Sequence, residues 1–140
     1  MAKRYQLIDH TADTGIRVFG KDPAELFSRA GEALFDIIFG LENISGAQKG
    51  GRVEVGGEDF PDLMVGWLGK LLLKFELDDF LSSRFDIIHL DEKHLSADVF
   101  GERFNPRAHK ALAEVKGVTY HGLKVGQKDG LWTAEVIFDV

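Results

Sequence analysis

Two stretches of the chain carry apolar residues at the three-to-four-residue spacing of an amphipathic helix. The first follows Asp22-Pro23, a pair typical of a helix start because Asp caps free N–H groups and Pro suits the first helical position. Gly40 is a suitable residue to end it. The second helix is predicted to begin near Asp59–Pro61. The apolar faces predicted for the two helices consist of Leu26, Phe27, Ala30, Leu34, Ile37, Ile38 and Leu41, and of Leu63, Met64, Trp67, Leu68, Leu71, Leu72 and Phe75.

Shorter segments alternate between apolar and polar residues, which is typical of strands with one buried face. They predict strands at residues 4–8, 15–20, 52–55, 85–90, 95–101 and 131–139, and a strand over 115–125 that is interrupted by Gly117 and Gly122. The connections after residue 84 are short, and Asp129-Gly130 is a hairpin signal, so the pairing should be mainly antiparallel. We expect an α+β fold, one domain over residues 1–140, with two main helices packed on a mixed, mainly antiparallel sheet.

Composition narrows the class of protein. The chain has 140 residues, of which 44% are hydrophobic, and no cysteine, which excludes disulfides and thiol chemistry and fits a reducing cytoplasm. We expect no signal peptide and no membrane-spanning segment. The net charge of -6 argues against tight, direct nucleic-acid binding. A local basic group, made of Arg103, Arg107, His109, Lys110 and Lys116, is interpreted as surface that favours solubility.

The candidate chemistry lies between the first two predicted strands, in the segment Ile8-Asp9-His10-Thr11-Ala12-Asp13-Thr14-Gly15-Ile16. Loops between strands commonly carry function. Asp9, Asp13 and the distant Asp139 would suit a hard cation if the fold brings both ends of the chain together, and the main-chain carboxylate of Val140 would add an oxygen ligand. The commoner role of a single loop Asp is to stabilise a turn.

The histidines leave alternatives open. His10 has the chemistry of a general base, but a lone histidine is more often a buried group that orients its surroundings, and His121 is equally ambiguous. A metal-dependent hydrolase that uses His10, Asp13 and His121 is an alternative, although no nucleophile elbow or phosphate-binding loop accompanies these residues. A binding module without metal is another.

Three separated motifs resemble the archease family. The first is Asp9-His10-Thr11-Ala12-Asp13-Thr14-Gly15-Ile16, the second spans residues 114–123 (EVKGVTYHGL), and the third is the terminal Val136-Ile137-Phe138-Asp139-Val140. They occur in the family's order, and the resemblance covers essentially the whole chain. Gly117 departs from the pattern, because many members have Ala there.

The resemblance implies a non-catalytic accessory protein that activates the tRNA-splicing RNA ligase, which joins 2′,3′-cyclic-phosphate or 3′-phosphate ends to 5′-hydroxyl ends. Archeases promote guanylylation and multiple turnover of that ligase. By resemblance, Asp13, Asp139 and Val140 would bind a divalent cation, commonly Ca²⁺, with Mg²⁺ or Mn²⁺ as alternatives. Lys116 resembles a lysine implicated in function, whereas Asp9 and His10 belong to the motif without an assigned role. The alternative partner within the family is another RNA-processing enzyme, such as a tRNA methyltransferase.

Overall fold

Both predicted helices are present and are capped as the sequence indicates. The computed structural model describes residues 4–10 and 13–140, without the side chains of Asp9, His10 and Asp13. Helix α1 spans Pro23–Phe39 and α2 spans Phe60–Asp78. The carboxylate of Asp22 accepts the N–H of Glu25 at 2.8 Å, and Asp59 accepts the N–H of Asp62 at 2.9 Å, so each helix begins on an Asp cap. Gly40 ends α1 with a positive φ of 79°, before the short helix η1 (Leu41–Asn43).

The larger sheet combines the two ends of the chain. It contains β1 (Tyr5–His10), β2 (Asp13–Gly20), β8 (Leu131–Asp139), β6 (Gly117–Val118) and β7 (Lys124–Lys128). The order is β1-β2-β8, and both β6 and β7 pair with β8. They pair with different parts of it, β6 near its end and β7 near its start, so they lie in succession along one edge. β8 is therefore hydrogen-bonded on both sides.

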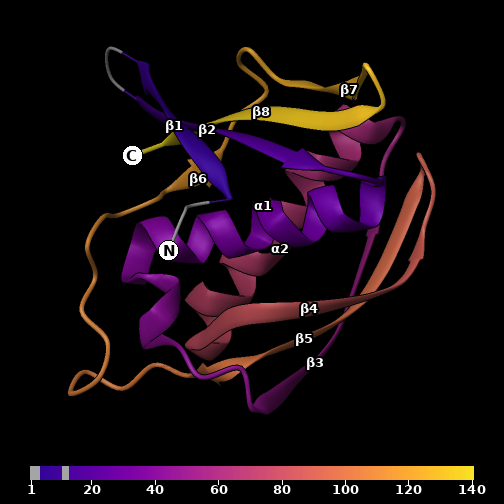
Figure 1. Ribbon diagram of the computed structural model, residues 1–140. Coiled ribbons are helices and arrows are strands. Elements are labelled where there is room, and N and C mark those ends of the chain that lie inside the picture. Colours follow the sequence, from indigo (N-terminus) through magenta and orange to yellow (C-terminus); the bar gives the residue numbers. More distant parts are fainter. Residues whose placement is uncertain (1–3, 11–12) are drawn as a thin grey trace.

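The smaller sheet has the order β3-β5-β4, with β3 at Gln48–Gly56, β5 at His94–Arg103 and β4 at Phe80–Leu90. Every recorded strand pairing in both sheets is antiparallel. The helices lie between the two sheets (Figure 1). The α+β class with two packed helices is confirmed, but the strands form two sheets instead of one mixed sheet, because each face of the helical layer carries apolar residues that require a cover.

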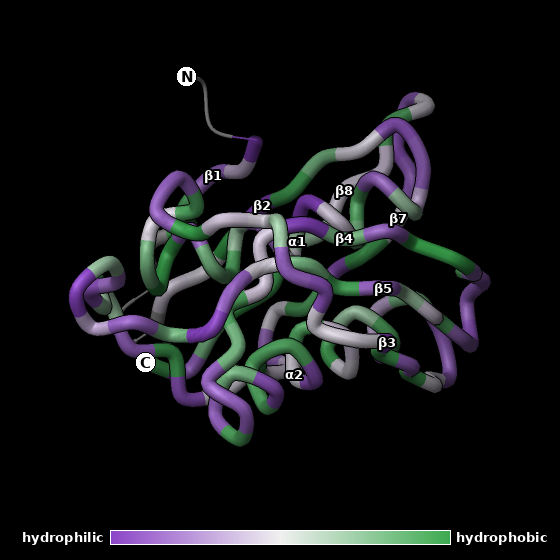
Figure 2. The backbone as a smooth tube through the Cα atoms, turned by 90° about the horizontal axis from the view of Figure 1, so that it is seen from below, coloured by the Kyte–Doolittle hydropathy of each residue, from purple (hydrophilic) through white to green (hydrophobic). Residues whose placement is uncertain are grey.

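The core fills the space between the helical layer and the two sheets. Both predicted helical faces contribute to it, and Trp67 is fully buried with its indole N–H donated to the carbonyl of Phe27 at 2.8 Å. In β8, Ala134, Val136 and Phe138 are fully buried, as the predicted alternation requires. Hydrophilic stretches lie at turns on the outside of the molecule (Figure 2). No helix in residues 4–10 and 13–140 is long and apolar enough to cross a membrane.

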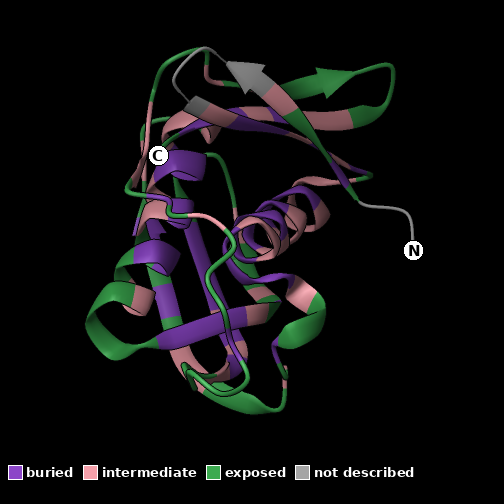
Figure 3. Cartoon of the chain, turned by 90° about the vertical axis from the view of Figure 1, so that its left-hand side faces the viewer, coloured by how far each residue is buried: buried purple, intermediate pink, exposed green. Residues whose placement is uncertain are grey.

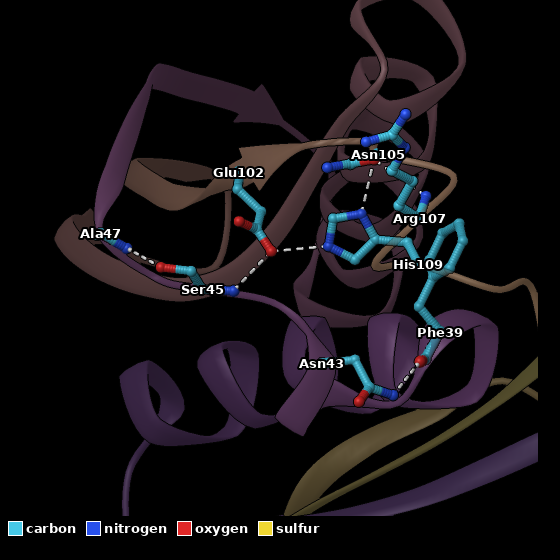
Figure 4. A network of polar contacts seen from close by, with 8 residues as sticks. All are labelled: Phe39, Asn43, Ser45, Ala47, Glu102, Asn105, Arg107 and His109. Atoms are coloured by element: carbon cyan, nitrogen blue, oxygen red, sulfur yellow. Dashed lines mark hydrogen bonds and ion pairs between the residues drawn. The ribbon is translucent and has the colours of Figure 1, made fainter.

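Residues 104–116 connect β5 to β6 as an irregular, mostly exposed segment (Figure 3). Its anchor is His109, which is only 2% exposed and so is not part of a basic surface, contrary to the sequence interpretation. His109 Nδ1 accepts the N–H of Asn105 at 2.9 Å, and Nε2 lies 2.7 Å from Oε1 of Glu102 (Figure 4). The same carboxylate oxygen accepts the N–H of Ser45 at 3.0 Å. The imidazole thus connects the segment to the chain that leads into β3.

Candidate functional site

The strand register brings three distant segments to one end of the larger sheet. β1 and β2 pair up to His10↔Asp13, and β2 pairs with β8 from Thr14↔Phe138 onward. On the other side of β8, Gly117 is opposite Asp139. The end of β1, the start of β2, the end of β8 and the start of β6 are therefore neighbours. All three sequence motifs meet at this end.

The predicted loop is shorter than the sequence suggested. Asp9 and His10 belong to β1, and Asp13 begins β2. Only residues 11–12 separate the strands, and they lie outside the described residues, as do the side chains of Asp9, His10 and Asp13. The alternation of polar and apolar residues did not predict this extension, because Asp is depleted in strands and the pairing with neighbouring strands overrides that preference.

Asp139 occupies a defined backbone position with an accessible side chain. Its carbonyl accepts the N–H of Lys116 at 2.7 Å, which locks the end of β8 to the start of the β6 segment. The preceding Phe138 is fully buried, whereas Asp139 is exposed and Val140 is 40% exposed. Lys116 is exposed as well. The Asp139 carboxylate therefore stands at the surface, on a backbone that is hydrogen-bonded to the backbone of Lys116 in the second motif.

The ligand set itself stays a prediction. Among the side chains that the structure describes, no three His, Asp or Glu residues are grouped closely enough to hold a metal ion. The side chains of Asp13, Asp9 and His10 are not among them. What the backbone provides is proximity of Asp13 to Asp139, since the β2–β8 register ends one residue short of this pair. Carboxylate oxygens so placed have the chemistry that a hard cation prefers.

The turn after β6 carries His121 and is fixed at both ends. The N–H and the hydroxyl of Thr119 both donate to the carbonyl of Ile137 at 3.0 Å, and the Thr119 hydroxyl oxygen accepts the N–H of His121 at 3.2 Å. Gly122 follows with φ 62°, a conformation that favours glycine. His121 itself is exposed. The structure thus places it on the segment that runs beside the end of β8.

Tyr120 connects this turn to the start of α2, a contact that sequence reasoning missed. Its hydroxyl donates to Oδ1 of Asp62 at 2.7 Å, although the ring is 63% exposed. This hydrogen bond raises the pKa of Tyr120. The same bond, with a second from the N–H of Glu58, lowers the pKa of Asp62. Nothing in the local sequence relates residues 58 positions apart, so only the fold reveals the pair.

Two motif glycines have different structural roles. A Cβ on Gly15 would lie 2.6 Å from Cδ1 of Ile137 and 3.1 Å from Cβ of Ile8, so a side chain here would force Ile137 to shift and would crowd the packing of β1, β2 and β8. A Cβ on Gly117 would meet nothing within 4 Å. The departure from Ala at Gly117 therefore changes no contact in the structure.

Comparison with known proteins agrees with the motifs. The archease protein family model matches residues 5–140. The chain is 34% identical to protein archease of Methanopyrus kandleri over 139 residues, which is 97% of this chain and 99% of the relative. It is also 34% identical to protein archease of Pyrococcus abyssi, with 99% of each chain covered.

Two solved structures also resemble this chain. The solution structure of Methanobacterium thermoautotrophicum protein 1598 has a TM-score of 0.83 and 32% identity, and covers 99% of this chain and 100% of its own. The crystal structure of a Thermotoga maritima archease, described as a possible chaperone, has a TM-score of 0.63 at 20% identity over 95% of this chain and 94% of its own, and so supports the fold. With the family match, the high coverage and the three motifs gathered at one end of a sheet, the chain belongs to the archease family.

Proposed function

We propose that this chain is a non-catalytic accessory protein that activates an RNA ligase of the tRNA-splicing type and docks through the end of the larger sheet where the three motifs meet. The observation that carries the proposal is the register: Thr14↔Phe138 on one side of β8 and Gly117↔Asp139 on the other. Residues that are over a hundred positions apart are thereby assembled into one small surface. Such an arrangement favours a functional explanation over three unrelated turns.

The proposed ligands for a divalent cation are the carboxylates of Asp13 and Asp139 and the main-chain carboxylate of Val140. Ca²⁺ is the first choice, with Mg²⁺ or Mn²⁺ as alternatives, because all the donors are hard oxygens. The carbonyl of Asp139 already accepts the N–H of Lys116, so the exposed side chain of Asp139 is the group left to face a ligand. A bound cation would supply positive charge at the contact with the ligase.

The chain's own residues would act by positioning. β8 is paired on both sides, so the location of Asp139 varies little, and a preformed site binds its partner without an ordering cost. Lys116 adds an exposed cation whose backbone is hydrogen-bonded to that of Asp139. We propose that Lys116 contacts an acidic or phosphate group of the ligase complex, while Asp9, His10 and His121 form the surrounding contact surface.

The test measures guanylylation and RNA joining by a cognate ligase, present at a lower concentration than its RNA substrate, with and without this chain. The variants Asp13→Asn, Asp139→Asn and Lys116→Gln should lose stimulation while they keep the melting temperature. Asp129→Asn is the matched control, because Asp129 lies at the opposite end of β8, in the hairpin with β7, and its φ of 54° suits Asn. Full stimulation by folded Asp13→Asn and Asp139→Asn would refute the proposed site.

The same experiment separates the alternatives. If the wild-type chain does not stimulate the ligase at all, the family's other role, modulation of an RNA-processing enzyme such as a tRNA methyltransferase, becomes the better proposal. A hydrolase would instead turn over phosphoesters without any ligase. The isolated chain should show no such turnover across a metal-supplemented panel of substrates, and activity that disappears in His121→Ala would favour the hydrolase.

A further inference from the structure

A small basic hollow lies at the end of the smaller sheet, away from the site described above. It has a volume of about 180 Å³ and is formed by the start of β3, the end of α2, the start of β4 and the end of β5. Three of its residues are cations from three different elements: Lys49, Lys74 and Arg103. The chain as a whole has a net charge of -6, so this local excess of positive charge runs against the rest of the surface.

Lys74 is held by packing, whereas Lys49 and Arg103 are exposed at the rim of the hollow. The side chain of Lys74 is only 20% exposed, and its ammonium lies 5.3 Å from the centre of the Phe80 ring. It forms a loose pair with Asp78 at 3.6 Å, and Lys49 forms one with Asp98 at the same distance. Arg103 is exposed and has no ion pair within residues 4–10 and 13–140. Its planar fork of N–H donors is available for an oxyanion.

The strand β3 contains a β-bulge at the edge of the hollow. The β3–β5 register shifts between Lys49 and Gly51, so Gly50 is the extra residue of a β-bulge and has no partner in the ladder. A Cβ on Gly50 would lie only 2.3 Å from Cε2 of Phe80. Glycine is therefore required for the bulge to approach the ring, and this approach brings the Gly50 peptide into the wall of the hollow.

We propose that this hollow binds a phosphate monoester or the free phosphate ion. Its lining carries three cations against one carboxylate, Asp78, a net of two positive charges. Asp98, the partner of Lys49, leaves this net charge unchanged because it pairs more closely with Arg52, at 3.0 Å. That charge matches a phosphate monoester, which carries close to two negative charges near neutral pH, whereas a carboxylate or a phosphodiester carries one. The volume accommodates one tetrahedral oxyanion with water, and Arg103 can donate two N–H groups to it.

The hollow is connected to the proposed ligase-binding end by residues 104–116, which run from the end of β5 to the start of β6 (Figure 3). This segment exposes Arg107, Lys110 and Lys116 and contains a single acidic residue, Glu114. A nucleotide or strand end held in the hollow would thus face a basic path toward the candidate site. The phosphate site does not depend on the ligase, so it can be tested on the isolated chain.

The test is a titration of the ¹⁵N-labelled chain, followed by amide shifts, at constant ionic strength. The probes are inorganic phosphate, a nucleoside monophosphate and a dinucleotide that has only a phosphodiester. Saturable shifts of the Lys49 and Gly50 amides are expected with the first two probes. Tighter binding of the monophosphate would identify a nucleotide or strand end as the source, and equal binding the free ion.

Charge-neutral variants provide the control. Arg103→Gln and Lys74→Gln should each weaken phosphate binding by about tenfold, since each removes a hydrogen bond to a charged group. Lys128→Gln, which removes an exposed cation from β7, should bind like the wild type. The melting temperature would reveal a folding defect in Lys74→Gln. Arg103 is exposed, so Arg103→Gln removes a cation from the hollow without disturbing the core. Absent saturation, equal weakening in Lys128→Gln, or equal affinity for the dinucleotide would each overturn the proposal.

Discussion

Replacing His109 by Ala should destabilise the fold strongly. The imidazole is 2% exposed and packs against two aromatic rings that also contact each other, with centroid distances of 6.2 Å to Phe39 and 6.0 Å to Phe104. Its removal leaves a cavity and costs about 2–3 kcal/mol by analogy with other large-to-small core changes. The N–H of Asn105 loses its acceptor, which adds about 1–2 kcal/mol. Glu102 still accepts the N–H of Ser45, so losing its contact with the imidazole costs less free energy than the unpaired N–H of Asn105 does.

The expected total is about 3–5 kcal/mol of the free energy of unfolding, measured by urea denaturation with fluorescence and circular dichroism. His109→Phe restores most of the ring packing but neither hydrogen bond, and should cost about 2 kcal/mol. His94→Ala, at the exposed first residue of β5, is the matched control and should change stability by less than about 0.5 kcal/mol. A His109→Ala loss below about 1 kcal/mol would refute the reasoning. So would faster amide exchange confined to residues 104–116 with unchanged global stability, because it would show that the anchor is local.

Three further predictions concern the glycines and acid stability. Gly69→Ala, in the interior of α2, should stabilise the chain by about 1 kcal/mol, because nothing lies within 4 Å of the added Cβ. Gly66→Ala should destabilise the chain, because its Cβ would lie 2.7 Å from Cγ1 of Val55. Thermal unfolding of the two variants measures this difference. Gly117→Ala should fold and activate like the wild type, and a defect in the ligase assay would show that the backbone of β6 needs glycine for partner binding. The N–H of Ser45 and the imidazole of His109 hold the pKa of Glu102 below its usual range, so this carboxylate stabilises the fold fully above about pH 4.5 and the contribution is lost as the pH falls through its folded pKa. Urea midpoints measured between about pH 6 and pH 3 should therefore fall less steeply in Glu102→Gln than in the wild type, and parallel curves would contradict the assignment.

The helices were predictable because their signals are local. Asp22 and Asp59 cap within three residues, and the apolar faces repeat within the helix itself. The division of strands into two sheets was not predictable, because it depends on which apolar face meets which helix after the chain has collapsed. β4 begins at Phe80, earlier than the alternation suggested, since Phe80, Leu81 and Ser82 are all buried and show no alternation. The two-residue strand β6 is too short to show an alternation of its own, and it is a strand only because it pairs with β8.

The candidate site was predictable only in part. Asp13 and Asp139 were singled out by residue type and by the family resemblance, yet their proximity follows from a strand register that no local pattern encodes. His109 illustrates the opposite failure. It stands among charged and polar residues, so the sequence favoured exposure, but its ring packs against Phe104 nearby and against Phe39 of α1. Its hydrogen-bond partners Asn105 and Glu102 are close in sequence, so what no local pattern predicts is the packing of this segment against α1.

The pairing of β2 with β8 also has a consequence for synthesis on the ribosome. β2 precedes the two helices along the chain, whereas its partner β8 follows every other element that the structure describes. The helices and β3, β4 and β5 can assemble earlier, since their contacts join elements that are closer in sequence. Until β8 emerges, the β1–β2 hairpin has an open edge and the apolar side of the helical layer that it later covers stays exposed. We therefore expect the nascent chain to bind a chaperone before β8 is made.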